Sequence, residues 1–215
     1  MQQFIHLPGK KIKTTDKKYR NHNAYSVWFG KKFPVVFDVA VLSNILSFIQ
    51  TYNLHWTHAD SASLQLIIQT IKDKDYIYHP LYVSPYYGKT AILLYHFARL
   101  MQIKKIDELE NLKPELIKEC YHQFELTNNM LVPILCVTAI YRFGERMPEV
   151  DLPPRDELIR QIEENNYPFF IGNIPSYLHN GLKKFFTKRK LLLYYHYCPA
   201  YNDALLLEYL VGRNK

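Results

Sequence analysis

The feature of this sequence that most constrains its fold is an alternation between two kinds of predicted helix. One kind is apolar around nearly its whole circumference, which is typical of a helix buried on all sides. The other kind carries a single apolar stripe, as in the segment that Asp60 or Ser61 caps and in Pro114–Leu126. The enclosed segments recur about every 45 residues, a period typical of stacked helical hairpins. They begin near Asp38, Tyr86, Met130 and Asn202.

This alternation predicts an all-α protein whose helical hairpins form a partial α/α toroid. The alternative is an open α-solenoid of the armadillo or HEAT type, because both architectures stack hairpins of helices. In either one the enclosed helices run in the same direction, so their N-termini gather on one face. No strand hairpin is expected, since Leu182–Tyr197 has the mixed pattern of a helix and Pro80 interrupts the apolar run Tyr76–Tyr82.

Composition and short motifs narrow the class of protein. With 215 residues, of which 48% are apolar, the chain can bury a substantial core, which excludes a disordered or disulfide-stapled chain. Its seven glycines form no phosphate-binding loop of the G-x-G-x-x-G or G-x-x-x-x-G-K type, which argues against the common nucleotide enzymes. Cys120, Cys136 and Cys198 are widely spaced and are expected to be reduced core residues. No stretch has the length and apolarity of a membrane span or a secretory signal, so a cytoplasmic location is expected.

The formal charge of +7 is concentrated in two basic blocks. Residues 10–20 carry six Lys and Arg side chains against Asp16 alone. Blocks of this kind bind the phosphates of nucleic acids or anionic lipids, or are simply solvated. No nucleic-acid-binding motif accompanies them, so nucleic acid is not the expected partner. The second block consists of Lys183, Lys184, Lys188, Arg189 and Lys190.

The predicted domain organisation follows from where the helical pattern begins. We expect residues 1–34 to be a basic, partly extended N-terminal arm, because they are polar and aromatic without helical periodicity. Residues 35–215 are predicted to form a single α/α helical-hairpin domain.

The starts of the four enclosed helices supply a candidate ligand pocket. Asp38 is placed to cap the first of these helices, and a cap needs no further role. The alternative is that tyrosines, amides and charges at the four starts hold a polar head group while the apolar helices hold a tail. The candidate ligand-binding residues are Asp38, Tyr86, Tyr87, Lys89, Thr90, Asn128, Asn129, Tyr201, Asn202 and Asp203.

Other chemistry-bearing residues do not form a recognisable site. His55 and His58 have ligand-like spacing, but no third ligand follows them, and Ser84 lacks the G-x-S-x-G elbow of a hydrolase. The sequence therefore predicts no metal site and no cofactor. The many tyrosines either line an aromatic cavity or, as is more common at helical spacing, belong to the core.

Four stretches at the starts of the enclosed helices carry a resemblance to a known family. They are Ala24–Gly30 leading into Phe37–Leu46, Tyr82–Tyr87 leading into Leu94–Arg99, Thr127–Leu135 and Pro199–Glu208. Together they resemble the prenyltransferase and squalene-cyclase-like α/α-toroid superfamily, in particular its uncharacterised bacterial members. The resemblance implies a ring of helices around a pocket for an isoprenoid-like molecule. The D-x-D-D, D-D-x-x-D and Q-x-x-x-G-x-W motifs of its enzymes do not occur in this sequence, so whether the chain is an enzyme is left open.

Three functions follow from these observations. The first is binding or transformation of an apolar, isoprenoid-like small molecule in a pocket at the starts of the enclosed helices. The second is a non-catalytic interaction module, or an oligomer in which a second copy or another chain completes the ring, because a full double ring needs more helices than this chain supplies. The third is binding to an anionic surface or nucleic acid through the lysine clusters.

Overall fold

The computed structural model describes residues 12–28, 33–146, 150–164 and 167–213. The all-α prediction is confirmed, since the described residues form eleven α-helices and one sheet of two strands. The chain divides into two compact units. Unit 1 comprises Met1–Lys89 and Ile171–Tyr194, and unit 2 comprises Thr90–Phe170 and Tyr195–Lys215.

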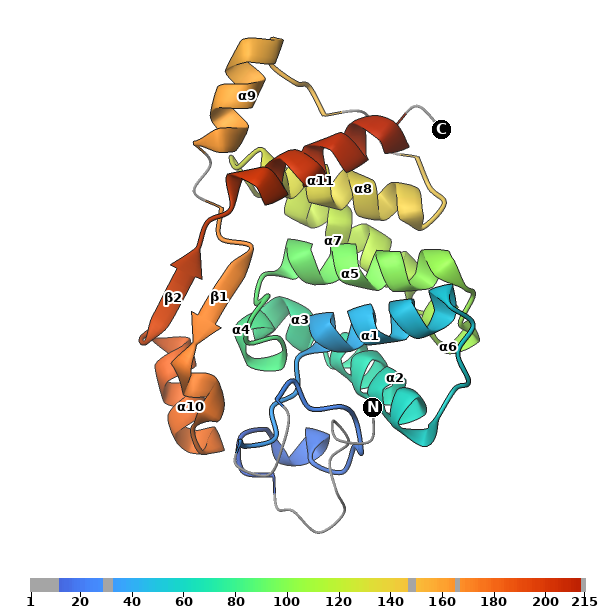
Figure 1. Ribbon diagram of the computed structural model, residues 1–215, viewed down its shortest axis with the longest axis vertical. Coiled ribbons are helices and arrows are strands. Elements are labelled where there is room, and N and C mark those ends of the chain that lie inside the picture. The colour runs from blue at the N-terminus through green and yellow to red at the C-terminus, as the bar shows by residue number, and fades with distance from the viewer. Residues whose placement is uncertain (1–11, 29–32, 147–149, 165–166, 214–215) are drawn as a thin grey trace. The chain divides into compact units, whose positions relative to one another are not determined.

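Unit 1 is built around a hairpin of two helices, α1 and α2, which pack against each other. Helix α10 packs against α4 and against the 3-10 helix Ile174–Tyr177. The α-helices of unit 1 are α1 (Val39–Thr51), α2 (His58–Lys72), α3 (Asp75–Tyr78), α4 (Pro80–Val83) and α10 (Asn180–Lys188), shown in Figure 1.

The N-terminal ends of α1 and α2 are fixed by side-chain caps. Asp38 caps α1, as its position in the sequence predicts. The predicted cap of α2 at Asp60 or Ser61 is wrong, because the helix starts earlier and Thr57 is its N-cap. Thr57 and Asp60 form a capping box, in which each side chain bonds the backbone N–H of the other residue. An acidic residue three positions into a helix thus resembles a cap in the sequence alone.

Unit 2 is built around helix α8. Helix α8 lies at its centre and packs against α5, α7 and α11, while α9 packs against α11. In Figure 1, α5, α8 and α11 run in the same direction within this unit. The α-helices of unit 2 are α5 (Thr90–Ile103), α6 (Asp107–Glu110), α7 (Lys113–Glu125), α8 (Leu131–Arg142), α9 (Arg155–Glu163) and α11 (Pro199–Gly212).

The predicted degree of enclosure is confirmed for two helices and wrong for two. Side chains around most of α5 and α8 are buried, as the sequence predicts. Helix α1 leaves Phe48 exposed, and α11 leaves Leu207 and Val211 exposed. An all-round apolar pattern therefore does not distinguish an enclosed helix from one whose outer face is apolar. Among the cysteines, Cys120 and Cys136 are buried as expected, whereas Cys198 is exposed.

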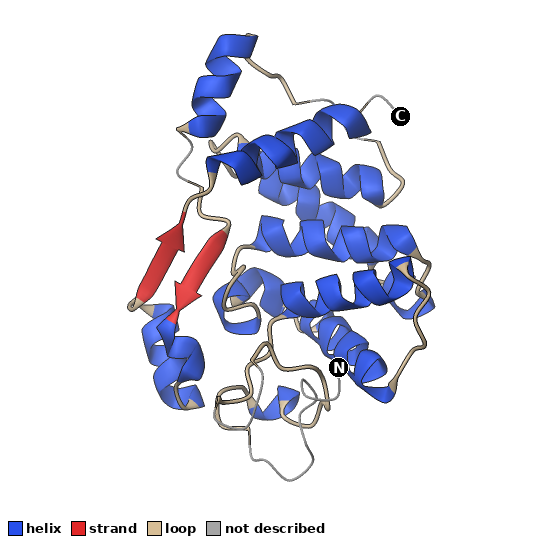
Figure 2. Cartoon of the chain, viewed as in Figure 1, coloured by secondary structure: helices blue, strands red, loops and turns tan. Residues whose placement is uncertain are grey.

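The prediction that no strands pair is wrong. Strands β1 (Phe170–Asn173) and β2 (Leu193–His196) form a sheet whose arrows run in opposite directions in Figure 2. The segment predicted as one mixed helix over Leu182–Tyr197 breaks after α10, where Lys190 and Leu192 have positive φ angles of 53° and 57°. The residues that follow are rich in tyrosine, which favours strands.

The described part of the predicted N-terminal arm is packed into unit 1. Residues 12–28 bury Ile12, Tyr19, Ala24 and Tyr25. The hydroxyl of Tyr25 donates a hydrogen bond to Asp60 at 2.8 Å, which attaches the segment to the start of α2.

Candidate functional site

Asp38 anchors the start of α1 to the turn that follows α4. Its carboxylate is fully buried and accepts hydrogen bonds from the N–H groups of Ala40 and Val41 at 3.0 and 3.2 Å. It also accepts a bond from the Ser84 hydroxyl at 2.6 Å and one from the Tyr86 N–H at 2.9 Å. Burial raises the pKa of this carboxyl, while these four donors act in the opposite direction. Both oxygens of Asp38 are thus bonded within unit 1, which is what a structural cap requires.

Lys183 of α10 is an unusual buried cation. Its side chain is 2% exposed, and its ammonium donates to the Tyr82 carbonyl oxygen at 3.1 Å and lies 4.3 Å from the centre of the Tyr82 ring. Burial lowers the pKa of the Lys183 ammonium to about 7, although the negative charge of Asp38 acts in the opposite direction. The Tyr82 hydroxyl in turn donates to the Asn180 side chain at the start of α10.

The burial pattern of α10 is inverted relative to an ordinary amphipathic helix. Lys183 is the residue that α10 buries, whereas Leu182 is 54% exposed and Phe185 is 47% exposed. An amphipathic helix that packs on a core normally turns its apolar stripe inward and its lysines outward. The fold of unit 1 therefore directs large apolar side chains of α10 away from its core.

The turn between α10 and β2 extends this exposed apolar area. Leu191 and Leu192 are 46% and 45% exposed, and Tyr194 at the start of β2 is exposed as well. The turn also carries three exposed cations. We call the whole set the basic-apolar surface. It consists of Leu182, Phe185, Lys188, Arg189, Lys190, Leu191, Leu192 and Tyr194.

The α10–β2 turn has a defined backbone. The N–H of Leu191 donates to the Phe186 carbonyl and that of Lys190 to the Thr187 carbonyl, which is the Schellman pattern of a helix end. Glycine usually occupies the left-handed position of this motif, but Lys190 occupies it here. The Leu192 carbonyl accepts a bond from the Ile174 N–H at 3.3 Å. These bonds hold the turn in place while its leucines stay exposed.

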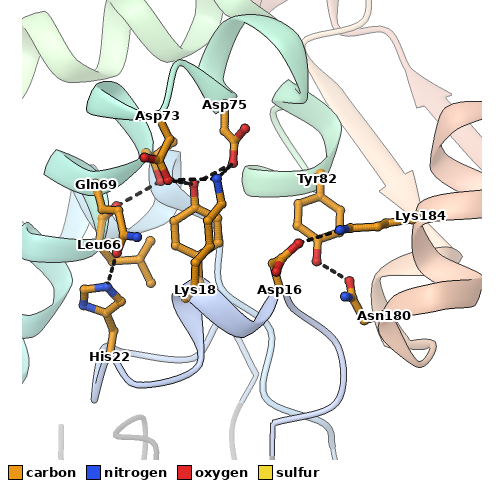
Figure 3. Close-up of polar contacts among 12 residues, drawn as sticks. Asp16, Lys18, His22, Leu66, Gln69, Asp73, Asp75, Tyr82, Asn180 and Lys184 are labelled. Atoms are coloured by element: carbon orange, nitrogen blue, oxygen red, sulfur yellow. Dashed lines mark hydrogen bonds and ion pairs between the residues drawn. The ribbon is translucent and has the colours of Figure 1, made fainter.

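The two basic blocks meet in unit 1, at the contact between the N-terminal segment and α10. Lys184 pairs with Asp16 at 2.5 Å, and the Asn180 N–H donates to the Lys13 carbonyl at 2.7 Å. Figure 3 shows Lys184 beside Asp16, from segments far apart in the sequence.

Carboxylates from the α2–α3 region neutralise part of the first basic block. Lys18 pairs with Asp73 at 2.8 Å and with Asp75 at 2.7 Å (Figure 3). The buried Tyr19 hydroxyl donates to Asp75 at 2.7 Å. His22 lies 2.7 Å from the Gln69 side-chain oxygen.

In the second basic block, Lys188, Arg189 and Lys190 have no carboxylate within salt-bridge distance among the described residues, and Arg189 lies over the Phe185 ring. The uncompensated cations of this region therefore lie beside the exposed leucines.

Four of the predicted ligand-binding residues, Asp38, Tyr86, Tyr87 and Lys89, belong to unit 1. The structure brings Asp38 and Tyr86 together through the backbone bond described above, and the Tyr86 hydroxyl contacts Trp28 at 2.9 Å and Ser176 at 3.0 Å. Lys89 is half-buried. Its pKa is lowered to about 8, mainly by burial and also by the nearby positive charge of Lys190.

The other six predicted residues lie at the starts of three helices of unit 2. Asn202 is buried and donates to the Ile162 carbonyl, and Tyr201 packs on Phe169 and Phe170 at ring distances of 4.5 and 5.4 Å. Because the two sets belong to different units, a single pocket that joins them stays a prediction. The unit 2 set consists of Thr90 at the start of α5, Asn128 and Asn129 just before α8, and Tyr201, Asn202 and Asp203 near the start of α11.

The described residues include cavities, but they do not meet the requirements of a metal centre or of a membrane-spanning helix. They contain no group of three or more metal-ligating side chains, and His58 lies in the first turn of α2. Nor do they contain a helix of the length and apolarity that would cross a membrane. In unit 1 a cavity of about 210 Å³ is lined by residues that include Lys13, Tyr177 and His179. In unit 2 a cavity of about 330 Å³ is lined by residues that include Glu110, Tyr121 and Glu145.

Sequence reasoning missed the basic-apolar surface as a candidate site. It identified the lysines of the second block, but it assigned Leu182–Tyr197 to one helix and so gave the leucines no special place. The sequence carries no signal for it, because Leu182, Phe185 and Phe186 have the i, i+3, i+4 spacing of an ordinary inward-facing stripe. No protein-family model, curated protein or solved structure significantly matches the chain.

Proposed function

We propose that this protein is a non-catalytic docking protein that binds an anionic partner through the basic-apolar surface of unit 1. The observation that carries the proposal is the inverted burial of α10, where Lys183 is inside and Leu182 and Phe185 are outside. Burying Leu182 and Phe185 would favour folding, so a pattern that exposes them opposes the stability of unit 1 on its own. Several large apolar side chains exposed within one short segment are typical of interaction surfaces.

The charge of the surface specifies the chemistry of the partner. Lys188, Arg189 and Lys190 follow one another at the end of α10 and have no carboxylate partner among the described residues. Asp16, Asp73 and Asp75 are all engaged with Lys184 or Lys18, so they do not compensate these three cations. A surface with this excess of positive charge attracts anionic partners, and the attraction weakens as salt screens it.

We expect neutralisation of the three cations to weaken binding to an anionic support. Replacing Lys188, Arg189 and Lys190 by glutamine removes three positive charges from exposed positions without emptying any part of the core. At about 1 kcal/mol for each cation near an anionic surface, affinity falls by about a hundredfold at low salt. Retention on a heparin column and titration against soluble heparin at several salt concentrations measure the loss.

A matched variant separates the site from the overall charge. Lys104, Lys105 and Lys118 are exposed lysines of unit 2, and replacing them by glutamine changes the net charge by the same amount. The proposal requires this control to bind nearly as the wild type does. Equal losses in the two triple variants would show that net charge alone drives binding, and would contradict a defined surface.

A second candidate function is binding of an apolar, isoprenoid-like molecule in unit 2, as the α/α-toroid resemblance implies. The observation that favours it is the common direction of α5, α8 and α11, which brings their starts to one side of the unit (Figure 1). Tyr201 and Asn202 lie at one of these starts beside Phe169 and Phe170. Apolar pockets with a few convergent polar groups are typical ligand sites.

For this second function we expect native mass spectrometry of gently purified protein to show an added mass that solvent extraction removes. Replacing Tyr201 by alanine would shrink the aromatic group and reduce the proportion of loaded protein, and the exposed Tyr52 gives a control position in unit 1. A bare monomer would contradict ligand binding, whereas a bare dimer would favour a ring completed by a second copy.

A further inference from the structure

We propose that the anionic partner is a lipid bilayer, and that Leu191 and Leu192 enter its interface while the neighbouring cations contact the lipid phosphates. This inference rests on the proposed function and assigns a partner to the same surface. It would make the α10–β2 turn a membrane anchor of a peripheral protein. Among the described residues, no helix has the length and apolarity of a membrane span.

The nature of the exposed apolar side chains favours lipid over nucleic acid. Nucleic-acid surfaces combine cations with aromatic rings that stack on bases. Here the most prominent apolar residues of the turn are the consecutive leucines Leu191 and Leu192, and Leu182 on α10 adds a third. Aliphatic side chains gain nothing from base stacking, but each gains free energy when it leaves water for hydrocarbon.

The remaining residues of the surface have the composition of a membrane–water interface. Tyr194 at the start of β2 and Phe185 on α10 are exposed aromatic residues within a few positions of the leucines. Tyrosine is enriched where headgroups meet acyl chains, because its ring is apolar and its hydroxyl is polar. Lys188, Arg189 and Lys190 lie between these aromatic residues in the sequence and supply the positive charge that anionic headgroups attract.

The backbone of the turn presents the two leucines in a fixed geometry. Lys190 and Leu192 both adopt left-handed conformations that non-glycine residues rarely adopt, on either side of Leu191. The bonds from Leu191 to Phe186 and from Ile174 to Leu192 keep this conformation. A strained turn that keeps leucines in water does not favour folding. It does present both side chains to a surface in a fixed conformation, so binding need not order the turn.

The experiment is flotation of the full chain with vesicles. One set contains phosphatidylcholine alone, and the other contains phosphatidylcholine with one third phosphatidylserine. The test variant replaces Leu191 and Leu192 by serine, and the control replaces the exposed Leu126 and Leu207 of unit 2 by serine. Circular dichroism checks that each protein is folded, which is expected because all four positions are exposed.

We expect the wild type and the control to float with the phosphatidylserine vesicles and not with phosphatidylcholine alone. The Leu191 and Leu192 variant should bind the anionic vesicles about tenfold more weakly, because it loses two inserting side chains but no charge.

The outcomes separate this inference from the proposed function. Equal vesicle binding by the leucine variant and the wild type would overturn the insertion of the leucines and leave electrostatic docking intact. Binding to heparin or to a single-stranded oligonucleotide without binding to vesicles would overturn the bilayer as partner, again with the docking surface retained. Failure of the wild type to bind any of these anionic probes would overturn both.

Discussion

Replacing Asp38 by alanine is expected to lower the free energy of unfolding of unit 1 by about 4 kcal/mol. The substitution removes the N-cap of α1, and it leaves the buried Ser84 hydroxyl and the Tyr86 N–H without their acceptor. Loss of a helix cap costs about 1 kcal/mol, and each buried donor left without a partner costs about 1–3 kcal/mol. The sum makes Asp38 one of the most sensitive positions in the chain.

Urea unfolding followed by tryptophan fluorescence measures this effect in the correct unit. The two tryptophans of the chain, Trp28 and Trp56, both belong to unit 1. Replacing Ser84 by alanine gives a graded comparison, because it removes one of the four hydrogen bonds and should cost about 1 kcal/mol. A loss below about 1 kcal/mol for the Asp38 variant would show that these bonds do not hold α1 to the turn before α5.

Replacing Lys183 by methionine is expected to raise the free energy of unfolding by about 2 kcal/mol at pH 7. Methionine matches the length of the lysine side chain and removes a buried ammonium whose pKa burial lowers to about 7. The variant loses the bond to the Tyr82 carbonyl and the contact with its ring, which reduces the gain. A stabilising substitution at a fully buried position would confirm that the inverted burial of α10 opposes stability.

The pH dependence gives this prediction a second readout. In the unfolded chain the lysine keeps its proton up to about pH 10, whereas the folded state releases it near pH 7. Between these values the unfolded state binds more protons, so the wild type gains stability as pH rises from 7 to 9, by about 2 kcal/mol. The methionine variant lacks this gain, so the difference between the two proteins should nearly vanish at pH 9.

Two comparisons make the pH result interpretable. Other titrating groups are common to both proteins and cancel in the difference between them. Replacing Lys184, which is exposed and pairs with Asp16, by methionine gives a matched loss of one lysine from the surface of α10. A constant difference between the Lys183 variant and the wild type over this range would contradict a lowered pKa for Lys183.

The sequence predicts well those elements whose local signals agree with one another. The start of α7 is clear because Pro114 lies in its first turn, and α1 is clear because Asp38 precedes an apolar run. In both cases the residues that define the helix end are neighbours in the chain, so no distant contact is needed to interpret them.

The elements that were missed depend on contacts that local patterns do not contain. The turn after α10 places Lys190 and Leu192 in left-handed conformations, for which a sequence usually shows glycine or asparagine. The burial of Lys183 depends on Tyr82, about a hundred residues earlier in the chain. Helical periodicity gives the spacing of apolar residues but not which face the rest of the chain covers, so it could not reveal the basic-apolar surface.

The candidate site, too, has features that the local sequence predicts and features that depend on distant contacts. Asp38 was identified as a cap from its position alone, but its bonds to Ser84 and Tyr86 span 46 and 48 residues. The ten predicted residues were grouped because they lie at the starts of enclosed helices, and four of them belong to unit 1 and six to unit 2. Hydrophobic periodicity shows where helices start but not which compact unit each helix joins.

The discontinuous sequence of unit 1 has a consequence for the order in which the protein folds during synthesis. Residues 171–194 of this unit leave the ribosome only after the helices from α5 to α9 have been made. Until then Asp16 and the Lys13 carbonyl lack the partners that α10 supplies from more than 160 residues away. The N-terminal segment must therefore wait until residues 171–194 have been made, and Leu191 and Leu192 are among the last residues of unit 1 to appear. A nascent chain would thus acquire its basic-apolar surface only when the rest of unit 1 is ready to hold it in place.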